Sequence, residues 1–336
     1  MTSETSETTG TAALAALVDL ATPFAVRTAV ALRLPELIRD GHTTTDALAQ
    51  ASGTDPDALA RLLRHLVAVG LFAEPAPGEH ALTGVSRALL DESHALLRSW
   101  LDAEGPGQKM DLAYSGMLHA VRTGRSAYGA VHGKDFWSDY REDEDLRTFF
   151  GATMAGFAWQ TGPEVAARYD WSAVSSVIDV GGGTGALLAA VLKAHPHLGG
   201  AVLDLPEVRP EAEEFLATLG GRAKFVGGSF FDPLPTGHDV LIVSRVLTDW
   251  PDADATRILT RCAEAAGEGR VLVVEVLAGA EHAKNNSSFD LQSLTLLGGR
   301  ERRPEDFDGL AAPAGLVRRG RIDGENGLVV LEYARA

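Results

Sequence analysis

The sequence has only one cysteine, Cys262, in 336 residues. A single thiol excludes an internal disulfide and a cysteine metal cluster, and its helical surroundings predict a small core side chain. The chain also lacks an apolar run of the ~18 residues that a bilayer-spanning helix needs. We therefore expect a cytoplasmic protein with no metal site and no membrane partner.

Positive charge is in short supply as well. The chain has 30 basic and 46 acidic residues, a net charge of −16. This balance disfavours nucleic acid and anionic membranes as partners. Residues 1–10 are rich in Thr, Ser and Glu, without the basic and apolar stretches of a signal peptide. They predict a disordered tail.

The N-terminal third has the pattern of a helical domain. Residues 11–39 carry a long helical pattern, and residues 43–85 then follow the order helix, turn, helix, wing. A winged helix is often a DNA reader, but this one lacks a basic recognition face. We therefore assign residues 11–100 to an N-terminal, all-helical winged-helix dimerisation domain.

Residues 101–170 predict a helical linker that contributes to a substrate pocket. The stretch is helical in pattern with aromatic insertions. Met154, Phe157 and Trp159 are nearest in sequence to the glycine motif described below, and could line a flat apolar pocket. For each of them singly, a place in the core is the competing interpretation.

Residues 171–336 change to alternating strands and helices. Five strand–helix units and a hairpin predict an α/β domain with a Rossmann-like, doubly wound seven-stranded sheet and one reversed edge strand. In such sheets ligands bind at the carboxyl ends of the first strands. The expected strands are 177–180, 201–205, 224–226, 239–243, 271–277, 316–322 and 328–336.

The richest motif lies at residues 177–185. A strand ending in Asp179 runs into Gly181, Gly183 and Gly185, and an alanine-rich helix follows. Glycines let a ligand lie against bare backbone at a helix N-terminus. The pattern predicts a nucleotide-like cofactor. A nicotinamide dinucleotide remains an alternative, because an acid, Asp204, follows about 20 residues later.

Five stretches together identify a family resemblance. In these motifs the chain resembles the two-domain S-adenosylmethionine-dependent O-methyltransferases of plant phenolics and bacterial natural products. The resemblance implies the methyl donor S-adenosylmethionine, a small aromatic acceptor and a homodimer formed through the N-terminal domain. The stretches are D-V-G-G-G-T-G at 179–185, L-D-L-P-E-V at 203–208, G-G-S-F-F-D at 227–232, V-L-T-D-W-P-D at 246–252 and G-G-R-E-R at 298–302.

The resemblance also implies which residues hold the donor. The three glycines would face its methionine part with Asp179 nearby, and Asp204 would accept both ribose hydroxyls. Ser229 stands where family members often place an acid for the adenine amino group. The other implied donor contacts are Leu205, Phe230, Ser244 and Arg245.

The catalytic position departs from the family. Its general base is a histidine directly before the D-W pair, and Thr248 stands there. A threonine hydroxyl is not a base near neutral pH. Glu275 and Glu301 match the two acids that orient the histidine; a structural ion pair with Arg300 or Arg302 is the alternative for them.

Three functions therefore remain open at this stage. O-methylation of a small aromatic metabolite is favoured by the resemblance, and C- or N-methylation is a close rival because of Thr248. The second is a relative that binds the donor without transferring methyl. The third is a nicotinamide-dependent reductase. The sequence fixes neither the acceptor nor the methylated atom.

Overall fold

The computed structural model describes residues 14, 17–278 and 283–336, so the predicted tail at 1–10 lies outside the described residues. The chain divides into two compact units, Met1–Lys109 and Met110–Ala336. The predicted linker at 101–170 falls largely in the second unit, and the predicted boundaries at 100 and 170 stay predictions. No helix in the described part of the chain combines the length and apolarity that spanning a membrane requires.

The first unit packs short helices around a small hairpin. Its buried core includes Leu48, Leu63, Leu66 and Phe72. The two-stranded sheet β1–β2 is the predicted wing, so the unit is helical apart from this hairpin. Its elements are α2 (Ala21–Ala31), α3 (Leu34–Arg39), α4 (Thr45–Ser52), α5 (Pro56–Ala68), β1 (Phe72–Ala76), β2 (Glu79–Leu82), α6 (Gly84–Ala88), η1 (Glu92–His94) and α7 (Ala95–Leu101).

The long helix expected at 11–39 is broken. α2 ends at Ala31, and Arg33 takes a left-handed conformation with φ 55° before α3 begins. Pro35 supplies the reason, because its ring would clash with the carbonyl of residue 31 in a continuous helix. The apolar pattern continued through this stretch and concealed the break.

The second unit begins with helices and continues into the sheet. Its helical part is α8 (Pro106–Asp111, which spans the boundary), η2 (Leu112–Gly116), α9 (Met117–Thr123), α10 (Tyr128–His132), α11 (Phe136–Glu142) and α12 (Glu144–Arg168). The strands are β3 (Ser176–Val180), β4 (Gly199–Asp204), β5 (Ala223–Gly227), β6 (Val240–Ser244), β7 (Arg270–Val276), β8 (Leu316–Asp323) and β9 (Leu328–Arg335). The remaining elements are α13 (Ala186–Ala194), η3 (Pro206–Val208), α14 (Arg209–Ala217), η4 (Leu247–Asp249), α15 (Asp252–Ala266), α16 (Ala283–Leu297), α17 (Pro304–Ala311), η5 (Ala312–Ala314) and η6 (Glu325–Gly327).

The seven strands form one doubly wound sheet in the order β5-β4-β3-β6-β7-β9-β8. All neighbouring strands from β5 to β7 pair in parallel, whereas β9 pairs antiparallel with both β7 and β8. The predicted seven-stranded sheet is confirmed. The reversed strand, however, is β9, one position inside the edge, and β8 is the edge strand.

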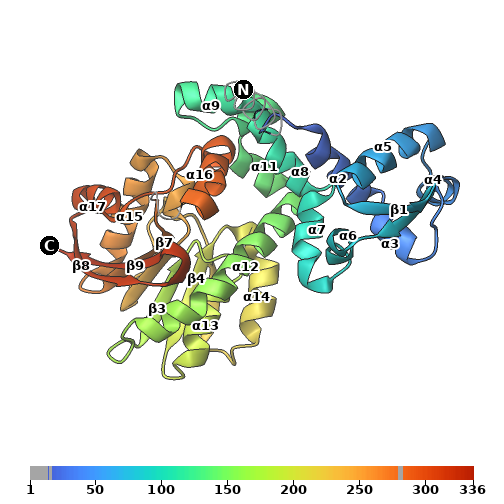
Figure 1. Ribbon diagram of the computed structural model, residues 1–336. Coiled ribbons are helices and arrows are strands. Elements are labelled where there is room, and N and C mark those ends of the chain that lie inside the picture. The colour runs from blue at the N-terminus through green and yellow to red at the C-terminus, as the bar shows by residue number, and fades with distance from the viewer. Residues whose placement is uncertain (1–13, 15–16, 279–282) are drawn as a thin grey trace, which may run out of the picture. The chain divides into compact units, whose positions relative to one another are not determined.

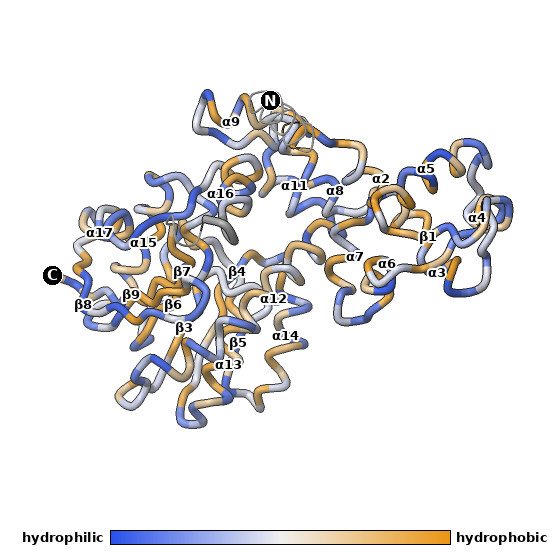
Figure 2. Tube along the Cα trace, viewed as in Figure 1, coloured by the Kyte–Doolittle hydropathy of each residue, from blue (hydrophilic) through white to orange (hydrophobic). Residues whose placement is uncertain are grey.

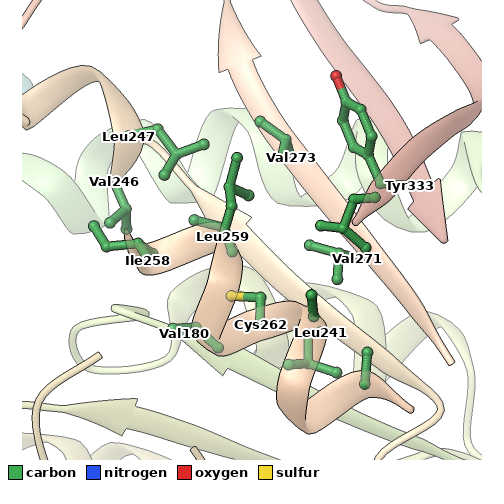
Figure 3. Close-up of a cluster of buried hydrophobic side chains, with 14 of the residues drawn as sticks. Val180, Leu241, Val246, Leu247, Ile258, Leu259, Cys262, Val271, Val273 and Tyr333 are labelled. Carbon is green, nitrogen blue, oxygen red and sulfur yellow. The ribbon is translucent and has the colours of Figure 1, made fainter. Parts of the chain in front are cut away.

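Helices cover both faces of this sheet. α12 and α13 lie side by side on one face, and α15 and α17 lie on the other (Figure 1). Hydrophobic colour is concentrated along strands such as β6 and β9 (Figure 2), as expected for strands covered on both sides. Cys262 lies on α15 among buried apolar side chains (Figure 3), which agrees with the predicted core role.

Candidate active site

The glycine turn after β3 leaves backbone open to a pocket. Gly181 and Gly183 have φ of 75° and 58° and both line the pocket. A Cβ on Gly181 would fall 2.7 Å from Val246 Cγ2, so a side chain has no room there. A Cβ on Gly183 would meet no protein atom within 4 Å and would project into open space. The backbone at Gly183 is therefore accessible to a ligand.

Gly185 has a different task from the one predicted. It does not line the pocket, and a Cβ there would fall 2.8 Å from Leu216 Cδ2 and 2.9 Å from Val202 Cγ2. Its φ of 93° starts α13. Gly185 thus permits close packing of α13 and α14 against the sheet, and its predicted contact with the donor is corrected to a packing role.

Asp179 is buried at the end of β3. Its side chain is 1% exposed, and neither carboxylate oxygen has a hydrogen-bond partner in the described chain. Burial raises the pKa of Asp179 to about 7, and the charge of Asp204 adds to the rise. A cation bound in the pocket would stabilise its charged form.

Asp204 ends β4 with its carboxylate held by backbone. Oδ2 accepts a hydrogen bond from Gly183 N at 2.7 Å, and Oδ1 accepts one from Leu205 N at 2.7 Å. These bonds fix the carboxylate against the glycine turn, and each oxygen keeps a lone pair for a ligand hydroxyl. Burial raises the pKa of Asp204, which these two N–H groups counteract.

The pocket lies at the carboxyl ends of β3 to β6, where the sequence predicts it. Its empty space, counted out to its open mouth, is about 1180 Å³. Nine of the ten predicted donor contacts are distributed along its lining: Gly181, Gly183, Asp179, Asp204, Leu205, Ser229, Phe230, Ser244 and Arg245.

Aromatic rings form one wall of the pocket. Trp137 and Trp250 are stacked, with ring centroids 5.6 Å apart and planes 7° apart. Phe230 meets the edge of Trp250 at 5.7 Å. Tyr140 and Phe150 also line the pocket. Sequence reasoning did not assign Trp137, Tyr140 or Phe150 to the pocket, because nothing in a one-dimensional pattern separates a pocket face from a core face.

One of the three predicted acceptor-pocket residues is misplaced. Met154 and Phe157 line the pocket from α12. Trp159 does not: it is 45% exposed and packs edge-on against Phe215, with Lys193 over its ring. The helical period explains the difference, since a residue five positions after Met154 points well away from its face, whereas Ala158 and Thr161 share it.

The predicted catalytic side chains lie behind the pocket lining. Thr248 is 3% exposed, and its hydroxyl donates to Arg300 O at 3.2 Å. Glu275 is 1% exposed; it accepts a bond from Thr248 N at 3.3 Å and pairs with Arg245 Nη1 at 3.4 Å. Neither Thr248 nor Glu275 lines the pocket. The structure thus brings Thr248, Glu275 and Arg245 together, and only Arg245 faces the ligand space.

Glu301 is half-buried near the same network but also outside the lining. Its backbone N–H donates to Asp290 Oδ1 at 2.7 Å. Burial raises the pKa of Glu301 to about 7; Arg245 opposes this rise, and Asp290 and Glu275 add to it. Among the described contacts, Glu301 makes no ion pair with Arg300 or Arg302, which both bind Asp252. Burial raises the pKa of Glu275, and the charge of Arg302 does act against this rise.

Asp249 is an acidic pocket residue that sequence reasoning missed. It is the last residue of η4 and lines the pocket beside Arg245 and Trp250. Burial raises the pKa of Asp249 to about 8; Arg245 lowers it and Glu275 raises it. The available signal was its position directly after Thr248, in the turn that follows the buried strand β6, which places an acid near the ligand edge of the sheet.

These residues fit S-adenosylmethionine, the cofactor that the resemblance implies. Asp204 has free lone pairs for ribose hydroxyls, and the open backbone at Gly183 admits the methionine part of the molecule. The partnerless carboxylate of Asp179 provides negative charge for an ammonium group. Phe230, whose ring lies 3.4 Å from the Cβ position at Gly181, supplies flat apolar surface for a purine ring beside the glycine turn.

Two family models match the chain. An O-methyltransferase domain matches residues 114–317, and an O-methyltransferase dimerisation domain matches residues 16–92. The first match contains every pocket-lining residue. The second covers most of the described N-terminal unit.

Several characterised relatives match nearly the whole chain. The 2,7-dihydroxy-5-methyl-1-naphthoate 7-O-methyltransferase of Streptomyces carzinostaticus is 47% identical, over 91% of this chain and 92% of its own. Aclacinomycin 10-hydroxylase RdmB of Streptomyces purpurascens is 39% identical, over 90% and 83%.

A crystal structure gives the same answer for the fold and the cofactor. The O-methyltransferase NcsB1 from neocarzinostatin biosynthesis, in complex with S-adenosyl-L-homocysteine and 1,4-dihydroxy-2-naphthoic acid, superposes with a TM-score of 0.89 at 44% identity, covering 96% of this chain and 98% of its own. These comparisons decide between the two cofactor interpretations in favour of the methyl donor over a nicotinamide.

Proposed function

The chain belongs to the S-adenosylmethionine-dependent O-methyltransferase family with an N-terminal dimerisation domain, and from that premise we propose that it methylates a hydroxyl group of a fused-ring aromatic acid. The observation that carries the proposal is one continuous pocket. It joins the glycine turn and Asp204 to the aromatic wall and to the β6 end with Arg245 and Asp249. Donor and acceptor can therefore meet in a single pocket.

The acceptor class follows from the lining. Stacked Trp137 and Trp250, together with Met154 and Phe157, offer flat apolar surface suited to fused aromatic rings. Arg245 adds a positive charge at the β6 end, which suits a carboxylate. A naphthoate combines both features, and the relative from Streptomyces carzinostaticus is named for one.

Catalysis by this pocket rests mainly on placement. When bound, S-adenosylmethionine supplies an electrophilic methyl group on a sulfonium. Asp204 and the backbone at Gly183 hold one reactant, and the aromatic wall orients the other while excluding water. Holding reactants at near-attack geometry can contribute up to ~7–11 kcal/mol. Base assistance adds ~10²–10⁴-fold, so loss of a histidine weakens transfer without abolishing it.

Further parts of the proposal concern Thr248 and the assembly. We infer that Thr248 stands where family members carry their base histidine, because it directly precedes Asp249 and Trp250. We also infer a homodimer, supported by the dimerisation-domain match, and a cytoplasmic location, supported by the single cysteine.

The test is an assay of purified protein with S-adenosylmethionine and 1,4-dihydroxy-2-naphthoic acid. We expect a product heavier by one methylene unit, with the new methyl on oxygen by NMR. The matched acceptor 2-naphthoic acid, which lacks hydroxyl groups, should bind without being methylated. Methylation of carbon or of an aminonaphthoate nitrogen, in place of oxygen, would contradict O-methylation.

A second candidate function is donor binding without methyl transfer. It is favoured by the 39% identical relative that is named a hydroxylase, and by the hydroxyl of Thr248, which is occupied by Arg300 O. The same assay separates the two. Donor that binds by calorimetry but is never converted to S-adenosylhomocysteine, across a panel of phenolic acids, would favour this second function.

A further inference from the structure

The β6 end of the pocket holds one carboxylate that the protein leaves available. Asp249 ends η4 and lines the pocket, and among the described residues no group donates a hydrogen bond to its side chain. An acid left in this state inside a ligand site can exchange a proton with whatever binds there.

The side chains of the two neighbouring residues predicted to be catalytic, Thr248 and Glu275, are already hydrogen-bonded within the protein. Thr248 Oγ1 donates to Arg300 O, and the two oxygens of Glu275 face Thr248 N and Arg245 Nη1. Neither residue lines the pocket. A proton leaving a bound acceptor therefore cannot reach Thr248 or Glu275 directly, whereas Asp249 borders the same space as the acceptor.

The turn that carries Asp249 is held from behind. Arg302, with a fully buried guanidinium, donates to the carbonyl of Leu247 and to Trp250 O, the residues on either side of Thr248 and Asp249. Gly299 approaches this turn so closely that a Cβ would collide with the backbone of Thr248 and Asp249. The Asp249 carboxylate is thus presented from a fixed backbone.

From this arrangement we propose that Asp249 is the proton acceptor for the substrate hydroxyl, an inference that rests on the proposed O-methylation. The acceptor oxygen forms its bond to the methyl carbon as the methyl–sulfur bond breaks, and that electron pair stays on sulfur as a neutral thioether. The hydroxyl proton passes to a carboxylate oxygen of Asp249, and from there to solvent after product release. No further reactant is needed for the balance.

The surroundings give this carboxylate useful basicity. Burial raises the pKa of Asp249, and the groups that face it are Arg245 at the end of β6, which lowers the pKa, and Glu275 on β7, which raises it. A buried acid with pKa near the working pH can accept a phenolic proton more readily than an exposed one.

The experiment is a series of hydroxynaphthoic acids and phenols of graded acidity, assayed with the wild type, Asp249→Asn and Asp249→Glu. For weakly acidic phenols we expect Asp249→Asn to lower kcat ~10²–10⁴-fold, and Asp249→Glu to recover part of it. For phenols already ionised at the assay pH the loss should be small. In the wild type, kcat for a weakly acidic phenol should rise with pH through about 8, and Asp249→Asn should lose this rise.

The control is Asp254→Asn, the same change at an acid on α15 that pairs with Arg257 and lies outside the pocket lining. It should leave every rate unchanged. Calorimetry with S-adenosylmethionine checks that the variants are folded. An equal loss for all phenols, or no loss for any, would overturn the role of Asp249 and leave the proposed O-methylation standing. If the wild type methylates none of the phenols, the proposed function itself is contradicted, and the role of Asp249 is contradicted with it.

Discussion

Asp179 is a carboxyl group buried without a hydrogen-bond partner among the residues described. The pKa of Asp179 is about 7 in the fold against ~3.9 in an unfolded chain. At a pH between these two values, Asp179 is protonated in the folded protein and ionised in the unfolded protein. The free energy of unfolding of the ligand-free protein therefore falls as pH rises through this window. A donor ammonium group would offset that cost.

Asp179→Asn should separate stability from binding. At pH 8 the variant should gain on the order of 1 kcal/mol or more in unfolding free energy without ligand, because a buried charge is removed. At pH 5 the gain should shrink, since Asp179 is then protonated. Donor affinity should fall at pH 8. Calorimetric melting at both pH values and donor titration check this; an equal gain at both pH values would contradict it.

The glycines of the turn should respond differently to one added methyl group. Gly183→Ala places a Cβ in open pocket space, so donor affinity should fall by ~10-fold or more. The left-handed backbone at this residue also costs the folded state ~1–2 kcal/mol once a Cβ is present. Gly185→Ala drives its Cβ into Leu216 and Val202, so overpacking of ~1–3 kcal/mol adds to the backbone strain. Its folded fraction should bind donor normally. Equal losses of affinity in the two variants would refute this division.

The site residues that could be located from the sequence are those whose role follows from the local backbone structure. Asp204 and the pocket glycines follow from strand, turn and helix order, which is local in the chain. The direction of a helical side chain and the partner of a buried hydroxyl are not local. For that reason Trp159 was placed on the wrong face of α12, and Asp249 was overlooked beside Thr248.

At the scale of elements, η4 depends on a side chain about 50 positions away. Arg302 donates to two carbonyls around η4 and pairs with Asp252 Oδ1 at 2.8 Å. A guanidinium can make these bonds together because its donors form a fixed fork. We call these contacts of Arg302 the clamp; they hold η4, a turn too short to keep its shape by itself.

Arg302→Lys should loosen that turn. The ammonium cannot reproduce the fork, so we expect a loss of ~1–3 kcal/mol from unsatisfied carbonyls, together with a lower kcat. Arg300→Lys is the matched control: it changes the other arginine bound to Asp252, which is half exposed, and should shift stability by at most ~1 kcal/mol. Melting temperatures and initial rates measure both. If the two variants behave alike, the clamp is not what holds η4.

Elements with strong periodicity were predictable, and their breaks were not. All seven strands of the large sheet fall within a few residues of their expected positions. The interruption of the first helix at Arg33 depends on the ring of Pro35, and the place of β9 inside the edge depends on pairing with β7, a contact distant in sequence. The spacing of hydrophobic residues indicates burial, but it predicts neither the break in the first helix nor the position of β9 in the sheet.

At the scale of the whole molecule, the two units divide the tasks. Every pocket-lining residue lies in Met110–Ala336. The first unit exposes a run of large apolar side chains before and within α2: Leu14, Leu17, Val18, Leu20 and Phe24. Apolar surface of this kind, within a segment that matches a dimerisation domain, is suited to burial against a second copy.

The double variant Leu20→Glu/Phe24→Glu should therefore convert a dimer into a monomer. Charges placed in a buried apolar interface carry a desolvation cost that the second copy cannot offset. Sedimentation or light scattering measures the mass in solution. Arg39→Glu, a charge change on α3 outside this run, should remain dimeric. A double variant that stays dimeric would place the interface elsewhere.

The position of β9 has a consequence for synthesis on the ribosome. β7 emerges with one edge unpaired, and its partner β9 follows only after residue 328. Until then Val271, Leu272, Val273 and Val274 present an apolar strand edge, the kind of surface on which nascent chains aggregate. Truncation or a bulky fusion within β9 should therefore reduce the yield of folded protein before it affects any property of the pocket.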